Sequence, residues 1–172
     1  MTSSIRRALV AFALTAGLIA GSSISAQADT PTITISKTDI YTGHGTNHRI
    51  GTLTQTYNPN TRTAQATWWP VGWDSGTGPL EKPSIWLENG PNTHTLTSAT
   101  DNGYIDAFST SPYPIDQLSY PKTIDAAIHI KYGYVYMDIL EIKSQTCDSW
   151  VSGAAHDYST GENHGGWTKY VC

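Results

Sequence analysis

Residues 49–71 alternate between apolar and polar side chains with a period of two, the pattern of a half-buried β-strand. The face expected to be buried comprises Leu53, Gln55, Tyr57, Ala64, Ala66 and Trp68. The opposite face is rich in threonine. Asn58-Pro59-Asn60 interrupts the alternation with residues that favour a turn, because proline fixes φ and asparagine tolerates the next turn position. The segment is therefore predicted to be a β-hairpin.

Similar short segments recur along the chain and are separated by residues that favour turns. Their ranges are 32–38, 84–88, 93–100, 104–110, 124–131 and 135–143. Asn102-Gly103 predicts a hairpin between 93–100 and 104–110, because Asn-Gly favours the turns that join twisted antiparallel strands. Tyr132-Gly133-Tyr134 is expected to be the turn between the last two segments.

Glycine and proline predict loops at 42–48, 70–83 and 111–121. No segment beyond the N-terminal region keeps the 3.6-residue period of a helix. Only 14% of the residues are charged, and ten tyrosines and six tryptophans suit strands with a hydroxylated solvent face. These features predict a single all-β domain, either an antiparallel β-sandwich or a small β-barrel.

Residues 1–28 have the pattern of a secretory signal peptide. Arg6 and Arg7 precede an apolar run that is too short to span a bilayer, and Ala26-Gln27-Ala28 forms a small-x-small cleavage site. An N-terminal membrane anchor is the alternative, and the paired arginines leave the twin-arginine export route open. Cleavage would leave residues 29–172 as one secreted domain, outside the cell or at its surface.

The charge balance of the secreted part bears on its partners. Without the leader, eight basic residues remain against fourteen acidic ones, which gives a formal net charge of about −6. The remaining Lys and Arg are scattered, and this disfavours nucleic acid as a partner because phosphate binding needs a basic face. The sequence has no second long apolar run, so no membrane span is predicted, and a monomer is expected.

The two cysteines, Cys147 and Cys172, both lie in the exported part. Outside the cytoplasm they are expected to form a disulfide, which would act as a structural staple rather than as a redox centre. The segment between them is rich in glycine and lacks a core pattern of its own. The bond is therefore expected to attach a C-terminal tail to the sheet.

Histidines and acidic residues supply the reactive groups of the sequence. His156, Asp157 and His164 are the candidates for acid–base catalysis, and His44 and His48 form a second pair. Their spacing matches no metal-binding motif, so neither a metal site nor a cofactor is predicted. The sequence has no Gly-x-Ser-x-Gly segment, and its many carboxylates single out no glycosidase pair.

Tryptophans are the stronger candidates for a binding role. Exposed indoles can stack on the apolar face of a sugar ring while neighbouring polar groups bind its hydroxyls. Trp69 is preferred because alternation with the buried Trp68 places it on the solvent face, and Trp73 follows in the adjacent loop. The other candidates are Trp150 and Trp167. The alternative is that these rings cap the ends of the core.

Two blocks of the sequence are similar to a known family. The first is Ile50-Gly51-Thr52-Leu53-Thr54-Gln55-Thr56-Tyr57-Asn58, followed by a turn and an alternating strand. The second is Val135-Tyr136-Met137, which leads to Cys147-Asp148-Ser149-Trp150 and Gly153. Together they resemble the small secreted proteins related to spore-associated protein A of filamentous actinobacteria, although residues 63–71 lack the cysteine typical of those proteins. The resemblance implies export and attachment to the cell or spore surface, and it supplies no catalytic residues.

The expected function is binding rather than catalysis. A secreted protein of this kind would attach to a surface polysaccharide or peptidoglycan, or form part of a coat. Two other classes remain open. One is a secreted proteinase inhibitor that presents the loop at 111–121, and the other is a small secreted hydrolase that uses the histidine cluster.

Overall fold

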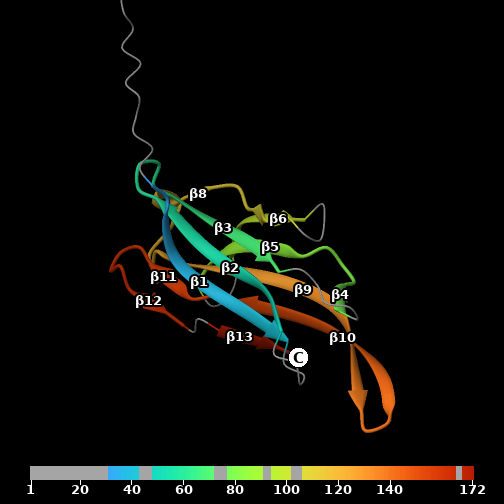
Figure 1. The fold of residues 1–172 in the computed structure, drawn as a ribbon. Helices are drawn as coiled ribbons and strands as arrows, with labels where there is room; N and C mark the ends of the chain where they lie inside the picture. The colour runs from blue at the N-terminus through green and yellow to red at the C-terminus, as the bar shows by residue number, and fades with distance from the viewer. Residues whose placement is uncertain (1–30, 43–47, 72–76, 91–93, 102–105, 166–167) are drawn as a thin grey trace, which may run out of the picture.

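The computed structural model describes residues 31–42, 48–71, 77–90, 94–101, 106–165 and 168–172. Within these residues the chain forms two β-sheets that pack face to face (Figure 1). This confirms the all-β prediction and, of the two alternatives, selects the sandwich. No helix in the described part is long and apolar enough to cross a membrane.

The first sheet has six strands in the order β13-β1-β2-β3-β7, and β8 also pairs with β3. Its strands are β1 (Ile33–Thr42), β2 (Arg49–Asn58), β3 (Thr63–Pro70), β7 (Phe108–Ser109), β8 (Tyr113–Pro114) and β13 (Thr168–Val171). A short 3-10 helix, η1 (Ile115–Gln117), follows β8. All pairs are antiparallel except β1 with β13, which run parallel.

The second sheet has seven strands in the order β12-β11-β9-β5-β6, with β4 and β10 also paired to β9. Its strands are β4 (Thr77–Pro79), β5 (Ser84–Asn89), β6 (His94–Thr100), β9 (Thr123–Asp138), β10 (Glu141–Ser152), β11 (Ala155–Asp157) and β12 (Asn163–His164). The core lies between the two sheets. Its largest buried side chains include Trp68, Tyr132, Ile40, Leu53, Ile85 and Ile128.

The predicted hairpin is confirmed as β2 and β3, which pair from Gly51 opposite Pro70 to Asn58 opposite Thr63. Trp68 is 1% exposed and Trp69 is 53% exposed, so the two adjacent indoles point to opposite faces as the alternation predicts. Gly51 lies against the ring of Trp68, where a Cβ atom would overlap the indole.

The turn predicted at Tyr132-Gly133-Tyr134 is wrong, because β9 continues through it to Asp138. Both tyrosines are buried on the core face, so the period-two alternation is kept and the strand has no reason to end there. The observed turn is Ile139-Leu140, which joins the opposed residues Asp138 and Glu141.

The hairpin predicted between 93–100 and 104–110 is also wrong. β6 pairs with β5 in the seven-stranded sheet, whereas β7 pairs with β3 in the six-stranded sheet. Phe108 lies opposite Trp68 and packs against the core, so tertiary packing overrides the local turn preference. Asn102-Gly103 falls outside the described residues.

The disulfide between Cys147 and Cys172 is confirmed, with 5.9 Å between the Cα atoms. Cys147 belongs to β10 of one sheet, and Cys172 follows β13 of the other, so the bond connects the two layers of the sandwich. The intervening segment contributes to both sheets through β11, β12 and β13. It also buries Ala154 and Val171, so the segment is part of the sandwich rather than an attached tail.

Candidate functional site

The outer face of the seven-stranded sheet carries an unusual set of side chains. On β9 the even-numbered residues from Ile124 to Tyr132 face the core, so the odd-numbered residues face outward. The strand register extends this outer face over β5 and β10. From one end to the other, the rows are Glu88 and Asp125; Trp86, Ala127 and Ser152; Ser84, His129 and Trp150; and Lys131 with Asp148.

Trp150 and His129 form the centre of this face. Their rings are stacked with centroids 4.2 Å apart and an interplanar angle of 16°. The indole is nevertheless 67% exposed, because the imidazole covers only one of its faces. We refer to this pair as the aromatic platform. It presents a flat apolar surface whose orientation is fixed by a second ring.

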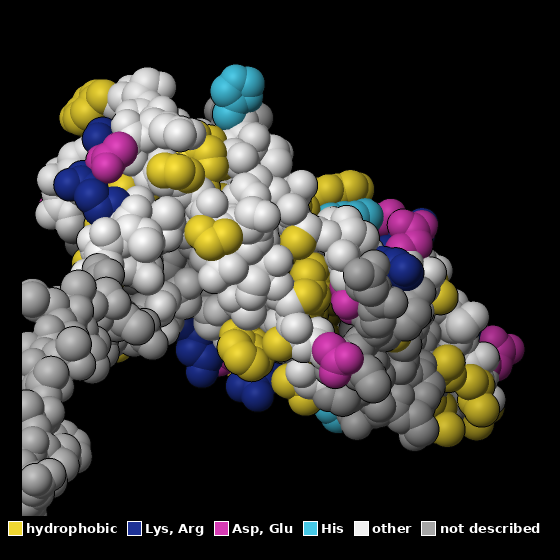
Figure 2. Space-filling model, turned by 90° about the horizontal axis from the view of Figure 1, so that it is seen from above, with side chains coloured by type: hydrophobic (Ala, Val, Ile, Leu, Met, Phe, Trp, Pro, Cys, Tyr) yellow, Lys and Arg dark blue, Asp and Glu magenta, His cyan; other side chains and the backbone are white. Residues whose placement is uncertain are grey.

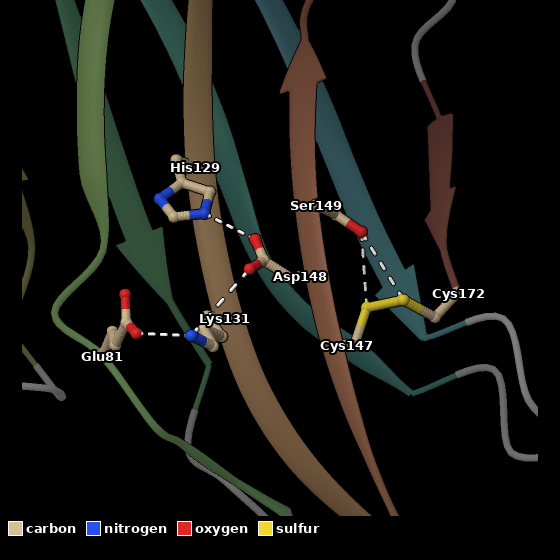
Figure 3. Close-up of polar contacts among 7 residues, drawn as sticks. All are labelled: Glu81, His129, Lys131, Cys147, Asp148, Ser149 and Cys172. Carbon is tan, nitrogen blue, oxygen red and sulfur yellow. Dashed lines mark hydrogen bonds and ion pairs between the residues drawn. A yellow bond between two sulfur atoms is a disulfide. The ribbon is translucent and has the colours of Figure 1, made fainter.

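Three charged side chains, Asp148, Lys131 and Glu81, lie next to His129 of the aromatic platform (Figure 3). Asp148 Oδ1 is 2.7 Å from His129 Nε2, and Asp148 Oδ2 is 3.9 Å from Lys131 Nζ. Lys131 also donates a hydrogen bond of 2.5 Å to Glu81. This hydrogen bond and the charge of Glu81 raise the pKa of Lys131, so its ammonium group stays protonated. The chain of contacts from Glu81 to His129 holds the imidazole beneath Trp150.

A carboxyl pair lies on the opposite side of the platform. Glu88 accepts hydrogen bonds from Trp86 Nε1 (2.8 Å) and Ser152 Oγ (3.1 Å). Asp125, opposite Glu88, is 6% exposed. Burial, then the negative charge of Glu88 and a hydrogen bond with it, raise the pKa of Asp125 to about 7. Below that pH the two carboxyl groups therefore share a proton.

The carboxyl pair does not have the geometry of a glycosidase. Retaining and inverting enzymes separate their two carboxyl groups by roughly 5 Å or more, so that a sugar or a water molecule fits between them. Asp125 and Glu88 instead lie directly opposite one another on adjacent strands, where Glu88 raises the pKa of Asp125, and Asp125 is buried. The pair therefore fixes Trp86 through Glu88 and does not present two separate catalytic groups.

A hollow of about 230 Å³ borders Trp150 where β10 lies next to β13. Its lining includes Ser152, Lys169 and the exposed ring of Tyr170. Tyr170 contacts Tyr41, with ring centroids 5.7 Å apart. The accessible side of the platform is thus flanked by hydroxyl groups, an ammonium group and a second aromatic ring.

The predicted catalytic residues do not converge. His156 is buried, with Nδ1 2.7 Å from Asn163 Oδ1 and its ring in a T-shaped contact with Tyr158. Asp157 accepts the backbone N–H of Ser159, and this bond lowers its pKa, as in a turn-stabilising aspartate.

His164 lies opposite Ala155, whereas His156 lies opposite Asn163, so the two imidazoles point to opposite faces of β11 and β12. His164 instead pairs with Glu162 at 3.7 Å. Of the second pair, His48 is an exposed residue next to β2, and His44 lies outside the described residues. Across the described part of the chain, no three His, Cys, Asp or Glu residues form a metal-binding group.

The predicted ligand-binding tryptophans are also placed apart. Trp69 projects from β3 on the outer face of the six-stranded sheet, where its indole N–H donates to Thr54 Oγ1 at 3.3 Å. Trp150 projects from the outer face of the other sheet, so the two indoles cannot contact one ligand surface. Trp73 and Trp167 lie outside the described residues.

The segment considered for proteinase inhibition, 111–121, is anchored rather than free. Ile115 and Leu118 are buried in the core, and Asp116 forms an ion pair of 2.7 Å with Arg62. Tyr120 near its end is strongly exposed. The segment is thus fixed at its middle, where an inhibitor would need an accessible peptide bond.

The partners of Trp150 were not found from the sequence. His129, Asp148 and Trp86 become neighbours only through the register of β5, β9 and β10, which depends on a 16-residue β9. No family model matches the chain, and the comparisons with curated proteins and with solved structures found no match. The fold and the outer face define an all-β sandwich with an aromatic platform and flanking charged groups.

Proposed function

We propose that the protein is exported and binds a glycan of the cell surface, either a polysaccharide or the glycan of peptidoglycan. The binding surface is the outer face of the seven-stranded sheet, centred on the aromatic platform of Trp150 and His129. The observation that carries the proposal is an indole that is 67% exposed and yet stacked on a second ring. Such a ring is oriented before any ligand arrives.

Two properties of this face favour a sugar over an apolar ligand. Indole rings stack on the C–H face of a pyranose, while the hydroxyl groups around the ring need polar partners. Asp148 and Lys131 lie on one side of Trp150, and Ser152 and Glu88 lie on the other. The surface therefore offers hydrogen-bond donors and acceptors along the direction of the strands, as an extended glycan chain requires.

The fixed orientation of Trp150 reduces the entropy that binding would lose. An exposed tryptophan without support must give up its rotamer freedom when a ligand stacks on it, whereas this one is already packed on His129. The contact between His129 and Asp148 extends the same restraint to the imidazole. Both contacts restrain an exposed ring, and this supports a role for the platform in binding a ligand.

The test is retention of the protein on insoluble chitin, cellulose and peptidoglycan. Trp150→Ala is expected to abolish retention on the polymer that holds the wild type, with the fold intact by circular dichroism. Trp69→Ala is the matched control, because it removes a similarly exposed indole from the opposite sheet. His156→Gln is expected to have no effect.

Two results would contradict the proposal. One is retention of the wild type that survives Trp150→Ala, and the other is no retention on any of the three polymers. Loss of retention with Trp69→Ala alone would place the binding surface on the six-stranded sheet instead.

A further inference from the structure

The hairpin formed by the ends of β9 and β10 projects beyond the body of the sandwich (Figure 1). Its two turn residues, Ile139 and Leu140, are 91% and 92% exposed. Met137 and Ile142, which lie opposite one another, are also strongly exposed. Figure 2 shows hydrophobic side chains gathered at the end of the molecule from which this hairpin extends. Four large aliphatic side chains at one exposed tip are unusual for an isolated soluble domain.

The tip is also conformationally strained. Ile139 has φ of 49°, in the left-handed region that β-branched residues strongly disfavour. Glycine or asparagine usually occupies such a turn position. An isoleucine at this position strains the backbone and exposes an apolar side chain to water. Neither backbone conformation nor solvation therefore explains why an aliphatic residue occupies the turn.

β10 provides an edge next to this tip. Within the described residues it pairs only with β9, so its other side exposes backbone N–H and C=O groups. Residues 141–146 are all exposed. Natural edge strands are usually protected by proline, bulges, short length or charged side chains. This one is long, has no proline or bulge in 141–146, and carries only Glu141 and Lys143 as charged residues there. Such an edge is suited to pairing with another strand.

A hollow of about 430 Å³ lies at the base of the same hairpin. Its lining combines Leu80, which is half exposed, with Val135 and the strand segment 144–146 of β10. Gly133 lies beneath Leu80, so no side chain from β9 fills this position. The hairpin thus carries an apolar projection at its tip and, at its base, a depression lined by both apolar and polar side chains.

We propose that two copies of the chain associate through β10, paired antiparallel about a two-fold axis at Ile142. In this register Glu141, the first residue of β10, lies opposite Lys143 of the second copy. The turn of each hairpin then points along the β10 edge of the other copy towards the hollow at its base. The two Ile142 side chains meet at the axis, and the exposed Met137 of each copy lies beside them.

Charge complementarity favours this register over the neighbouring one. With the axis at Ile142, Glu141 of each copy lies opposite Lys143 of the second copy, so two pairs of opposite charge form across the interface. A shift of the axis to Lys143 would place the two lysines opposite each other. The dimer departs from the monomer expected from the sequence, because the free edge becomes visible only in the sheet topology.

A second copy fits this tip better than a lipid surface does. The turn at the tip is only two residues long, and acidic residues, Asp138 and Glu141, flank it on both sides. The chain as a whole is acidic, with a formal net charge of −4. Anionic lipids would repel such a tip, whereas a second copy places a lysine opposite Glu141.

The first experiment is sedimentation equilibrium of the purified protein over a wide concentration range. The wild type is expected to dimerise reversibly. Ile139→Gly combined with Leu140→Ser removes the apolar tip and relieves the strained φ, so this variant is expected to fold at least as stably and to remain monomeric. Ile33→Ser, which removes an exposed isoleucine from the other sheet, is the control and is expected to dimerise like the wild type.

The second experiment tests the register by mixing two variants. E141K places like charges at both contacts in its own dimer, and K143E does the same, so each is expected to dimerise at least about tenfold more weakly than the wild type. An equimolar mixture restores both opposite-charge pairs and is expected to form the heterodimer. A dimer that ignores both changes overturns the register.

A protein that stays monomeric at every concentration overturns the proposal. So does the Ile139→Gly, Leu140→Ser variant if it dimerises like the wild type. Flotation with vesicles of phosphatidylcholine and phosphatidylglycerol supplies a further arm. A monomer that binds these vesicles through the tip would assign the hairpin to a lipid surface and would reject the dimer.

Discussion

Asp125 and Glu88 lie opposite one another on β9 and β5, and their carboxyl groups share a hydrogen bond at the edge of the aromatic face. A hydrogen bond between two carboxyl groups requires a proton on one of them. Asp125 Oδ1 is buried without a hydrogen-bond partner in the described part of the chain, so the ionised form of Asp125 is poorly solvated. The folded structure therefore holds this proton below about pH 7.

The stability of the protein is expected to decrease with rising pH. The pKa of Asp125 is raised from 3.8 to about 7, so between these values the folded state holds a proton that the unfolded state has released. The free energy of unfolding should fall as pH rises from about 4 to about 7, by about 1.4 kcal/mol for each unit of pKa shift, and level off above pH 7. Urea denaturation at several pH values measures this slope.

Asp125→Asn is the control for this effect. The amide can donate to Glu88 without a titrating proton, so the variant should show a smaller loss of stability between about pH 4 and about pH 7. A wild-type stability that rises over this range would contradict the assignment of the proton to Asp125.

Replacement of both Cys147 and Cys172 by serine is expected to reduce the free energy of unfolding by about 2 to 4 kcal/mol. The bond closes a loop across the two sheets, and the unfolded chain gains entropy without it. Because β13 is a short edge strand, the segment after β12 should become sensitive to protease before the rest of the sandwich does. Earlier cleavage in the β2–β3 turn would show that the order of local unfolding is different.

Gly51→Ala is expected to destabilise the fold by about 1 to 3 kcal/mol, because its methyl group would overlap the ring of Trp68 and approach the Trp69 carbonyl oxygen to 2.8 Å. A change in the fluorescence of the buried indole should accompany the loss. Gly133→Ala is the matched control, since its nearest neighbour is the flexible end of Leu80 at 3.4 Å. Thermal denaturation of the two variants compares them directly.

We expect export of a product that begins at Asp29 and contains no free thiol, because residues 26–28 match a small-x-small cleavage site and the two cysteines are paired. Intact-mass analysis after alkylation without reduction measures both properties. A retained leader or an alkylated cysteine would contradict the expectation.

Local patterns predicted the parts of the fold that depend on neighbouring residues. The alternation around Leu53 and Trp68 specified the β2–β3 hairpin and its buried face, because adjacent strands joined by a tight turn share one register. The turn at Tyr132-Gly133-Tyr134 was predicted from a glycine, but the two flanking tyrosines fill the core. Their burial outweighs the weak preference of one glycine for a turn.

The aromatic platform could be predicted only in part. Trp150 was identified as a candidate because it is aromatic and lies near loops, but the stack on His129 depends on the pairing of two strands that bring residues 21 positions apart into one row. Asp125 and Glu88 likewise meet through the pairing of β5 with β9. Such contacts follow from sheet topology, which single-strand periodicity does not specify.

The parallel pairing of β1 with β13 also governs when the fold can be completed. Asp39 and Thr168 are neighbours in the sheet although about 130 residues separate them along the chain. The first strand therefore cannot obtain this partner until nearly all of the remaining sequence has been synthesised. Until then β1 has an open edge that only the arrival of β13 closes, so the rate of this late step sets how long the incomplete sandwich is exposed to aggregation and proteolysis.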